Sequence, residues 1–320
     1  MALLQSTPVS VTTDVFQEGD IRYKSFPFPD KSKKSTSTTP SPPKPLLIFT
    51  PTVPGLYPVI LFCHGFCLRN SFYEKLLGHI ASHGFTVVAP QFYEPLCYML
   101  GIVEVKCAGN VADWIAQNLQ SVLPGNVKAN LEQFVIAGHS RGGKIAFAVA
   151  LGHAQNKLKP SVLIGIDPVE GFSNCKLGRT FPHILTYVPR SLNLGMPVAV
   201  IGTGLGPEKK NIFSKPCAPQ GLNHKEFYNE CKPPCAYFVT KDYGHMDMLD
   251  DNPPSMVGKM SSCMCKNGTG PRDFMRRTVG GLVVAFLRAY LNDQREDLEA
   301  IVMNNSIAPA TLDPVDYLPA

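Results

Sequence analysis

The sequence has no apolar run that could cross a membrane. The longest one near the C-terminus, residues 279–287, lies between Arg277 and Arg288 and is well short of the roughly 18 residues that a spanning helix needs. Residues 1–20 lack the basic region and apolar block of a secretory signal, and their acidic residues are unusual in an organellar transit peptide. The sequence therefore predicts no transmembrane segment and does not by itself indicate a compartment.

Strong net charge and regular cysteine spacing are also missing. The formal net charge is +5, and part of it lies in the lysines of residues 31–34, so no broad basic face for nucleic acid is expected. Half of the 10 cysteines are crowded late in the chain: Cys217, Cys231, Cys235, Cys263 and Cys265. Their spacing differs from the paired spacing of a zinc module, which argues against a metal site. A disulfide that pins a loop is the preferred interpretation, and free thiols in a reducing compartment are the alternative.

The order of apolar runs predicts an α/β fold. Residues 31–45 are rich in Ser, Thr, Pro and Lys and are expected to form a flexible stretch at the end of an N-terminal segment, 1–45. The runs expected to form strands are LLIFTP, PVILFCHG, FTVVAP, FVIAGHS, SVLIGID, PVAVIG and AYFVT. They alternate with helical patterns, which predicts a mainly parallel sheet with helices on both faces. We assign this catalytic domain to 46–295 and a C-terminal tail to 296–320.

Two long segments interrupt this alternation. Residues 170–195 and 204–234 are rich in Gly, Pro, Asn and Phe, and each follows an expected strand. Ligand sites of α/β sheets lie at the carboxyl ends of the strands, and loops of this length are usually functional. We therefore interpret both segments as lids over a pocket.

The segment from residue 138 to 142, Gly-His-Ser-Arg-Gly, matches the G-x-S-x-G pattern of a nucleophilic serine. The apolar run FVIA precedes it and a helical pattern follows it, as this pattern requires. A sharp turn between strand and helix strains the backbone, which explains small residues two positions before and after the serine. Ser140 is the predicted nucleophile.

A serine hydroxyl needs a base, and the base needs an acid to orient it. His245 follows the last strand-like run, where hydrolases of this chain order carry the base. The acid most often follows the run that here is 197–202, but no aspartate is found there. Asp167, at the end of the preceding run, is the predicted acid, and Glu170 stays an alternative.

Ester cleavage also needs an oxyanion site. Two fixed backbone N–H groups stabilise the charged carbonyl oxygen by roughly 3 kcal/mol each. One should belong to Arg141, directly after the nucleophile. The other should belong to Phe66 in the segment FCHGFCLRN, which matches a lipase HG loop.

The motifs GHSRGG, GIDPVEGF, YGHMDMLDD and FCHGF occur together in this chain, and with them it resembles the plant chlorophyllases from about residue 14 to 291. The resemblance implies an α/β-hydrolase fold with loop lids over the carboxyl ends of the strands. It implies a triad of Ser140, Asp167 and His245 that cleaves the phytyl ester of chlorophyll to chlorophyllide and phytol. No metal or organic cofactor is expected.

The resemblance also suggests a chloroplast location and peripheral attachment to a membrane, although the family is not confined to one compartment. So apolar a substrate needs an apolar pocket, which the aromatic loops 92–100, 179–190 and 204–213 would supply. A general carboxylesterase or lipase would use the same triad, and a ligand receptor on the same fold is a further alternative.

Overall fold

A computed structural model describes residues 13–29, 39–93, 101–173, 178–253, 258 and 264–320. These residues form one sheet of 9 strands in the order β1-β2-β4-β3-β5-β6-β7-β8-β9. The strands are β1 (Tyr23–Phe28), β2 (Leu46–Pro51), β3 (Gly55–Cys63), β4 (Thr86–Pro90), β5 (Val127–His139), β6 (Val162–Ile166), β7 (Val198–Thr203), β8 (Cys235–Thr240) and β9 (Leu312–Leu318). Strands β3 to β8 are parallel to one another, whereas β1, β2 and β9 pair antiparallel.

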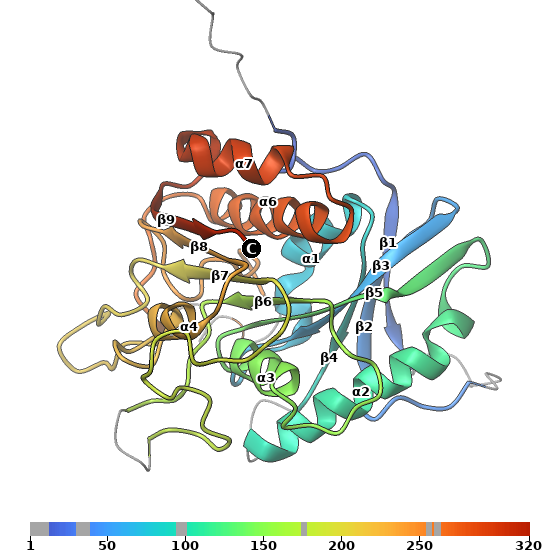
Figure 1. Ribbon diagram of the computed structural model, residues 1–320, viewed down its shortest axis with the longest axis horizontal. Coiled ribbons are helices and arrows are strands. Elements are labelled where there is room, and N and C mark those ends of the chain that lie inside the picture. Colours follow the sequence, from blue (N-terminus) through green and yellow to red (C-terminus); the bar gives the residue numbers. More distant parts are fainter. Residues whose placement is uncertain (1–12, 30–38, 94–100, 174–177, 254–257, 259–263) are drawn as a thin grey trace, which may run out of the picture.

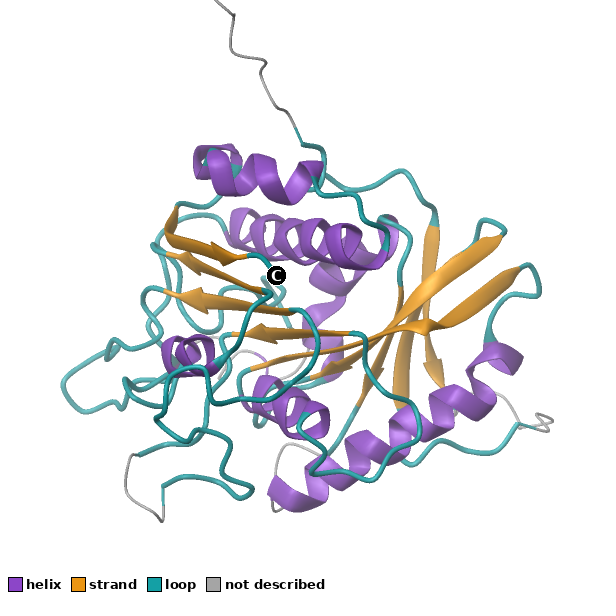
Figure 2. Cartoon of the chain, in the orientation of Figure 1, coloured by secondary structure: helices purple, strands orange, loops and turns teal. Residues whose placement is uncertain are grey.

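Helices cover both faces of the sheet. They are α1 (Glu74–Ser82), α2 (Gly101–Val122), α3 (Arg141–Ala150), α4 (His224–Glu230), α6 (Arg272–Leu291) and α7 (Glu296–Met303), with short 3₁₀ turns η1 (Asn70–Tyr73) and η2 (Asn305–Ile307). Figure 1 shows α1, α6 and α7 on one side and α2, α3 and α4 on the other. Figure 2 shows the strands between these two layers. The predicted α/β fold, with a mainly parallel sheet inside two helical layers, is confirmed.

All seven runs predicted to be strands form β2 to β8, because each is apolar enough to be buried on both faces. Every residue of β4, β6, β7 and β8 is buried. Two apolar clusters result, one between the sheet and α6 and the other between the sheet and α2 and α3. The sheet thus divides the core into two halves, and packing on both faces holds the carboxyl ends of the strands in place.

The sheet extends beyond the range 46–295 that was assigned to the catalytic domain. Strand β1 pairs with β2, and β9 pairs with β8, so parts of the predicted N-terminal segment and C-terminal tail belong to the sheet. Edge strands need only one apolar face and tolerate proline and charge. β9 reads LDPVDYL, so its pattern does not resemble that of a buried strand.

The two segments predicted to be lids follow β6 and β7 at the carboxyl ends of the parallel strands (Figure 1). A disulfide between Cys217 and Cys265 ties the 204–234 segment to the residues just before α6. The expected disulfide that pins a loop is therefore present, while Cys231 and Cys235 are buried free thiols. Within the described ranges, no helix has the length and apolar character of a membrane span.

Candidate active site

Ser140 lies on a strained turn between the last residue of β5 and the first residue of α3. Its φ and ψ angles are 58° and −124°, a region that non-glycine residues rarely occupy. The turn is held by backbone hydrogen bonds: Ser140 N–H donates to the carbonyl of Ile166 at 2.9 Å, and its own carbonyl accepts from Val169 N–H at 3.1 Å. Strain of this kind persists only where the surroundings enforce it, which supports a functional role for the turn.

The glycines around Ser140 have a steric reason. A Cβ atom on Gly138 would collide with the carbonyl oxygen of Gly142, and one on Gly142 would collide with the carbonyl oxygen of Cys63. Strand β5, the turn and the end of β3 therefore approach one another more closely than side chains would permit.

The structure brings Ser140, His245 and Asp167 into one hydrogen-bonded row. Ser140 Oγ lies 2.8 Å from His245 Nε2, and His245 Nδ1 lies 2.6 Å from Asp167 Oδ2. Because a carboxylate only accepts, Nδ1 carries the imidazole proton and Nε2 accepts from the serine hydroxyl. All three side chains are buried, with Ser140 the most accessible at 9 %. This arrangement can pass the serine proton to the imidazole as Oγ attacks a carbonyl carbon.

Asp167 has one further hydrogen-bond donor and a second imidazole beside its carboxylate. Thr203 Oγ1 donates to Oδ2 at 2.6 Å, and His224 Nε2 lies 3.8 Å from Oδ1. Burial acts to raise the pKa of Asp167, but the hydrogen bond and charge of His245, with help from His224 and Thr203, hold the pKa below its ordinary value. Asp167 thus stays ionised next to His245, the predicted base. Thr203 ends β7, so the strand end without an aspartate supplies a hydroxyl to the acid instead.

Glu170 has different partners. Its Oε1 accepts from Arg179 Nη2 at 3.0 Å and from the backbone N–H of Ile184 at 2.9 Å, and its Oε2 lies 3.6 Å from Lys144 Nζ. The carboxylate therefore holds the 170–195 segment, whereas the hydrogen bond to His245 is made by Asp167. Burial lowers the pKa of Lys144 to about 8, although Glu170 opposes this shift.

Phe66 and Arg141, the predicted oxyanion donors, line one cavity with Ser140. The cavity has a volume of about 30 Å³, and its other walls are Val169, Gly171, Phe172, Thr180 and Cys217. His64 braces the HG loop: Nδ1 lies 2.8 Å from the carbonyl of Gly65, and Nε2 accepts from Phe92 N–H at 3.0 Å. Donation by the two N–H groups to an oxyanion stays a prediction.

The Arg141 side chain is held on one side of this cavity. Its Nε and Nη2 atoms each lie 2.6 Å from Glu104 Oε2, and its guanidinium lies 5.0 Å from the centre of the Phe66 ring. Glu104 comes from α2 and is fully buried, and burial raises its pKa to about 7 even though Arg141 acts to lower it. Helix α2 therefore orients the residue that follows the nucleophile.

A second hydrogen-bonded chain connects the HG loop to the base. Gly65 N–H donates to the hydroxyl of Tyr73 at 3.1 Å, Tyr73 Oη lies 2.8 Å from His139 Nδ1, and His139 Nε2 lies 2.9 Å from the carbonyl of His245. Since that carbonyl only accepts, His139 carries its proton on Nε2 and accepts from Tyr73. The sequence did not suggest these roles, because the three contacts join distant parts of the chain.

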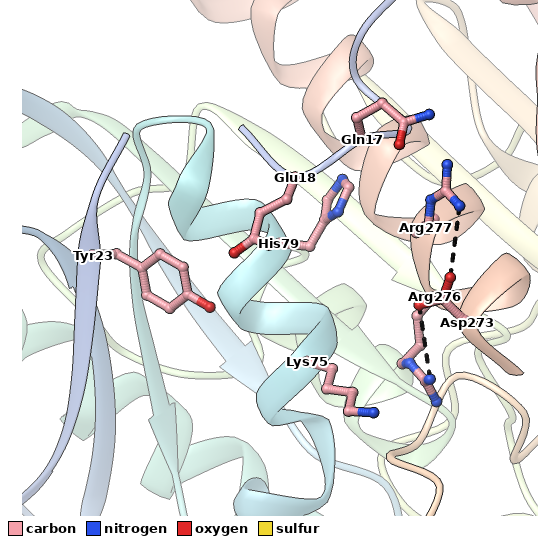
Figure 3. A pocket seen from close by; sticks show the side chains of 8 residues that line it. All are labelled: Gln17, Glu18, Tyr23, Lys75, His79, Asp273, Arg276 and Arg277. Atoms are coloured by element: carbon pink, nitrogen blue, oxygen red, sulfur yellow. Dashed lines mark ion pairs between the residues drawn. The ribbon is translucent and has the colours of Figure 1, made fainter. Parts of the chain in front are cut away.

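Larger cavities lie elsewhere. The one of about 800 Å³ is lined by Ser82 and His83, but the Ser82 hydroxyl donates to the carbonyl of His79 and His83 Nε2 lies 2.9 Å from the carbonyl of Gln17, so the two do not form a nucleophile–base pair. Figure 3 shows one of about 420 Å³ between β1, α1 and α6. Among the described residues that line it there is no serine or cysteine, and two of its arginines, Arg276 and Arg277, pair with Asp273 at 4.0 and 3.6 Å. Burial lowers the pKa of its histidine, His79, to about 4. The small cavity at Ser140 is thus the candidate active site.

Comparison with known proteins agrees with this geometry. The family model described as chlorophyllase matches residues 11–319. The chain belongs to the chlorophyllase family. Chlorophyllase-1 of Arabidopsis thaliana is 51% identical to it over 98% of this chain and 96% of that protein. Chlorophyllase-2 of the same plant is 50% identical over 83% of this chain and 84% of that protein, and chloroplastic chlorophyllase-1 of Citrus unshiu is 44% identical over 100% and 94%.

The predicted resemblance to chlorophyllases is therefore confirmed over nearly the whole chain. In this member of the chlorophyllase family, two aromatic side chains, Phe66 and Phe172, line the cavity. Phe172 packs edge-on against Phe66 with ring centres 5.6 Å apart, and it is 56 % exposed. Of the aromatic loops predicted to form the pocket, 94–100 lie outside the described residues, and Phe92 is fully buried in the core. Ile212 and Phe213, at the end of the predicted pocket loop 204–213, are highly exposed and do not line the cavity of Ser140.

Proposed function

We propose that the protein is a carboxylic ester hydrolase that cleaves the phytyl ester of chlorophyll to chlorophyllide and phytol. The observation that carries this function is the row of Ser140, His245 and Asp167 at 2.8 and 2.6 Å beside an aromatic cavity. Membership of the chlorophyllase family identifies the ester.

In the first half of the reaction, Ser140 Oγ attacks the ester carbonyl of the chlorin propionate while His245 Nε2 takes the serine proton. Asp167 stabilises the resulting imidazolium. The N–H groups of Phe66 and Arg141 would hold the oxyanion. The tetrahedral intermediate collapses as His245 gives its proton to the phytol oxygen, which leaves an acyl-enzyme.

In the second half, water gives a proton to His245 and attacks the acyl carbon. Collapse of the second intermediate returns the proton to Ser140 and releases the propionic acid group of chlorophyllide. Each proton that leaves the serine or water is restored by the same imidazole, so the cycle requires no cofactor.

The shape of the cavity suggests how a large pigment is held. The cavity at Ser140 is small and is lined in part by Phe66 and Phe172, so we infer that it receives the ester group and not the macrocycle. Phe172 and Phe181 are 56 % and 61 % exposed and offer flat apolar surface nearby. We infer that the macrocycle lies on this aromatic surface and that its propionate ester reaches Ser140.

The substrate and the relatives also suggest where the protein works. Chlorophyllase-1 proteins of Citrus unshiu and Citrus sinensis are named chloroplastic, and we assign the same compartment to this chain. Phytol has a long hydrocarbon chain that partitions into lipid. We therefore expect peripheral association with a membrane during turnover.

Turnover of wild type and Ser140→Ala tests this function. Purified proteins are offered chlorophyll a, p-nitrophenyl butyrate and a triacylglycerol, and the products are identified. We expect multiple-turnover release of phytol that Ser140→Ala abolishes and that Ser121→Ala, a change of an exposed serine on α2, leaves intact. Preference for the short ester or the triacylglycerol would indicate a general esterase or lipase, and binding of pigment without turnover would indicate a receptor.

A further inference from the structure

The loop between β7 and α4 carries a highly exposed apolar pair. Ile212 is 82 % exposed and Phe213 is 93 % exposed, the largest value among the exposed large apolar side chains of the described residues. Figure 1 shows this yellow loop projecting beyond the strand ends on the left. A single exposed apolar residue is ordinary, but an adjacent pair at the end of a projecting loop requires a reason.

The end of the loop is shaped by its own hydrogen bonds. Asn211 Oδ1 accepts from the N–H groups of Phe213 and Ser214 at 3.1 and 2.9 Å, and Ser214 Oγ accepts from Asn211 N–H at 3.0 Å. Asparagine turns of this kind fix the backbone without burying side chains. The two apolar side chains are therefore presented outward on an ordered turn, so little entropy is lost when they are buried.

Positive charge surrounds this apolar pair. Lys209, Lys210 and Lys215 are exposed, and the preceding acid, Glu208, pairs with Lys266 at 2.6 Å. A segment with apolar tips and lysines beside them matches the interface of a bilayer, where apolar groups enter the acyl boundary and ammonium groups stay with anionic headgroups. We call residues 209–215 the tip.

The tip is attached to the active site through the base of its loop. Ala218 N–H donates to the carbonyl of Gly206 at 3.0 Å, and Leu205 N–H donates to the carbonyl of Tyr243, two residues before His245, also at 3.0 Å. Cys217 lines the cavity of Ser140 and is joined to Cys265. A surface that holds the tip would therefore lie close to the mouth of the cavity.

We propose that the tip docks the protein on an anionic membrane surface, with Ile212 and Phe213 inserted at the acyl boundary and the lysines against the headgroups. The consequence for turnover rests on the proposed function: docking brings Ser140 to chlorophyll held in the bilayer. The other predicted lid also carries exposed apolar residues, Tyr187 and Val188 at 48 % and 57 %, and the Tyr187 hydroxyl donates to the carbonyl of Gly221 in the 204–234 segment.

Vesicle binding and turnover test the tip. The double variant Ile212→Ser, Phe213→Ser is compared with wild type and with Met303→Ser, which changes an 82 % exposed apolar residue at the end of α7. Cosedimentation uses vesicles of phosphatidylcholine with about 30% phosphatidylglycerol. We expect the affinity for these vesicles to fall by about 30-fold in the double variant, which is the loss expected if about half of each side chain is buried in the bilayer. The affinity of Met303→Ser should stay unchanged.

A second variant tests the charge. Changing Lys209, Lys210 and Lys215 to Gln should lower affinity by about 10-fold or more for the anionic vesicles, and high salt should have the same effect on wild type. Binding to pure phosphatidylcholine should change little. Unchanged binding of both tip variants to anionic vesicles would overturn the proposal.

Turnover separates docking from other roles of the tip. Hydrolysis of p-nitrophenyl butyrate and of detergent-dispersed chlorophyll should be unchanged in the double variant, while hydrolysis of chlorophyll in vesicles should fall with affinity. An equal loss with detergent-dispersed chlorophyll would show that the tip contacts the macrocycle, and the proposal would be wrong. If wild type released no phytol from any preparation but the tip variants still lost vesicle binding, the proposed function would fail and the docking surface would stand.

Discussion

Replacing Asp167 and Glu170 by their amides should separate catalysis from stability. Asp167→Asn keeps the shape of the side chain, but it removes the charge that His245 meets at 2.6 Å. The imidazolium then lacks its anion, and the amide favours the wrong tautomer. We expect kcat to fall about 10⁴-fold, equivalent to about 5.5 kcal/mol, with little change in stability.

Glu170→Gln should have the opposite effect. The side chain of Lys144 is 4% exposed and that of Arg179 is 16% exposed, and both lie near the Glu170 carboxylate. Removing one partner of a buried ion pair costs about 3 to 5 kcal/mol because the remaining charges are left uncompensated. In a chain of 320 residues, a loss of that size should lower Tm by about 4–7 °C. Below the transition, kcat on p-nitrophenyl butyrate should stay within about threefold of wild type, since His245 keeps its acid.

The assay combines initial rates on p-nitrophenyl butyrate and chlorophyll a at low temperature with thermal unfolding followed by circular dichroism. Asp242→Asn is the matched control, because Asp242 is an exposed carboxylate close to His245 in the sequence. It should change neither rate nor Tm appreciably. A 10⁴-fold loss in Glu170→Gln with unchanged Tm, together with an active Asp167→Asn, would refute the reasoning and identify Glu170 as the acid.

Two further predictions concern a buried acid and the disulfide. Burial raises the pKa of Glu104 from 4.5 to about 7, so the folded state binds a proton that the unfolded chain releases between these values. The contribution of this group to the free energy of unfolding should therefore fall as pH rises from about 4.5 to 7. The free energy of unfolding, measured in urea, should depend less on pH in Glu104→Gln than in wild type over this range. Equal pH dependence in the two proteins would contradict this. Replacing Cys217 and Cys265 by Ser opens a link across a separation of 48 residues, which should cost up to about 4 kcal/mol and raise KM for chlorophyll, because Cys217 lines the cavity. Cys107→Ser, at a free thiol, is the control for thermal unfolding, and equal Tm values would count against a stabilising role of the disulfide.

The buried strands could be predicted from the sequence, whereas the edges of the sheet could not. Strand β6 reads VLIGI and is buried throughout, so its composition alone indicates a central strand. Strands β1 and β9 are YKSFPF and LDPVDYL, in which exposed positions carry charge and proline. Their pairing depends on β2 and β8, which are partners distant in the sequence, and local composition carries no such information.

Some residues of the candidate site could likewise be predicted from the sequence, and others could not. Ser140 could be predicted because its turn requires a local pattern of small residues, and His245 because chain order limits where the base can lie. The choice between Asp167 and Glu170 could not be made from spacing, since both follow the same strand. It depends on which carboxylate faces the turn after β8, and the hydrogen bond from His245 Nδ1 to Asp167 supplies that information. Tyr73 and His139, 66 positions apart, could not be connected by any local signal.

The position of Asp167, the predicted acid, follows from the way in which the ends of β6 and β7 meet. Ser140 N–H donates to the carbonyl of Ile166, the last residue of β6, so the nucleophile turn and the residue that follows it, Asp167, are tied together by the backbone. Asp167 has a φ of 41°, and this unusual conformation lies next to a turn that is itself strained. Thr203 then reaches the same carboxylate oxygen from β7, the strand whose end carries the acid in most hydrolases of this order. Both strand ends thus converge on one point beside His245 Nδ1, so a carboxylate from β6 with a hydroxyl from β7 occupies the position at which a carboxylate from β7 would orient the imidazole, and we expect it to serve as the acid.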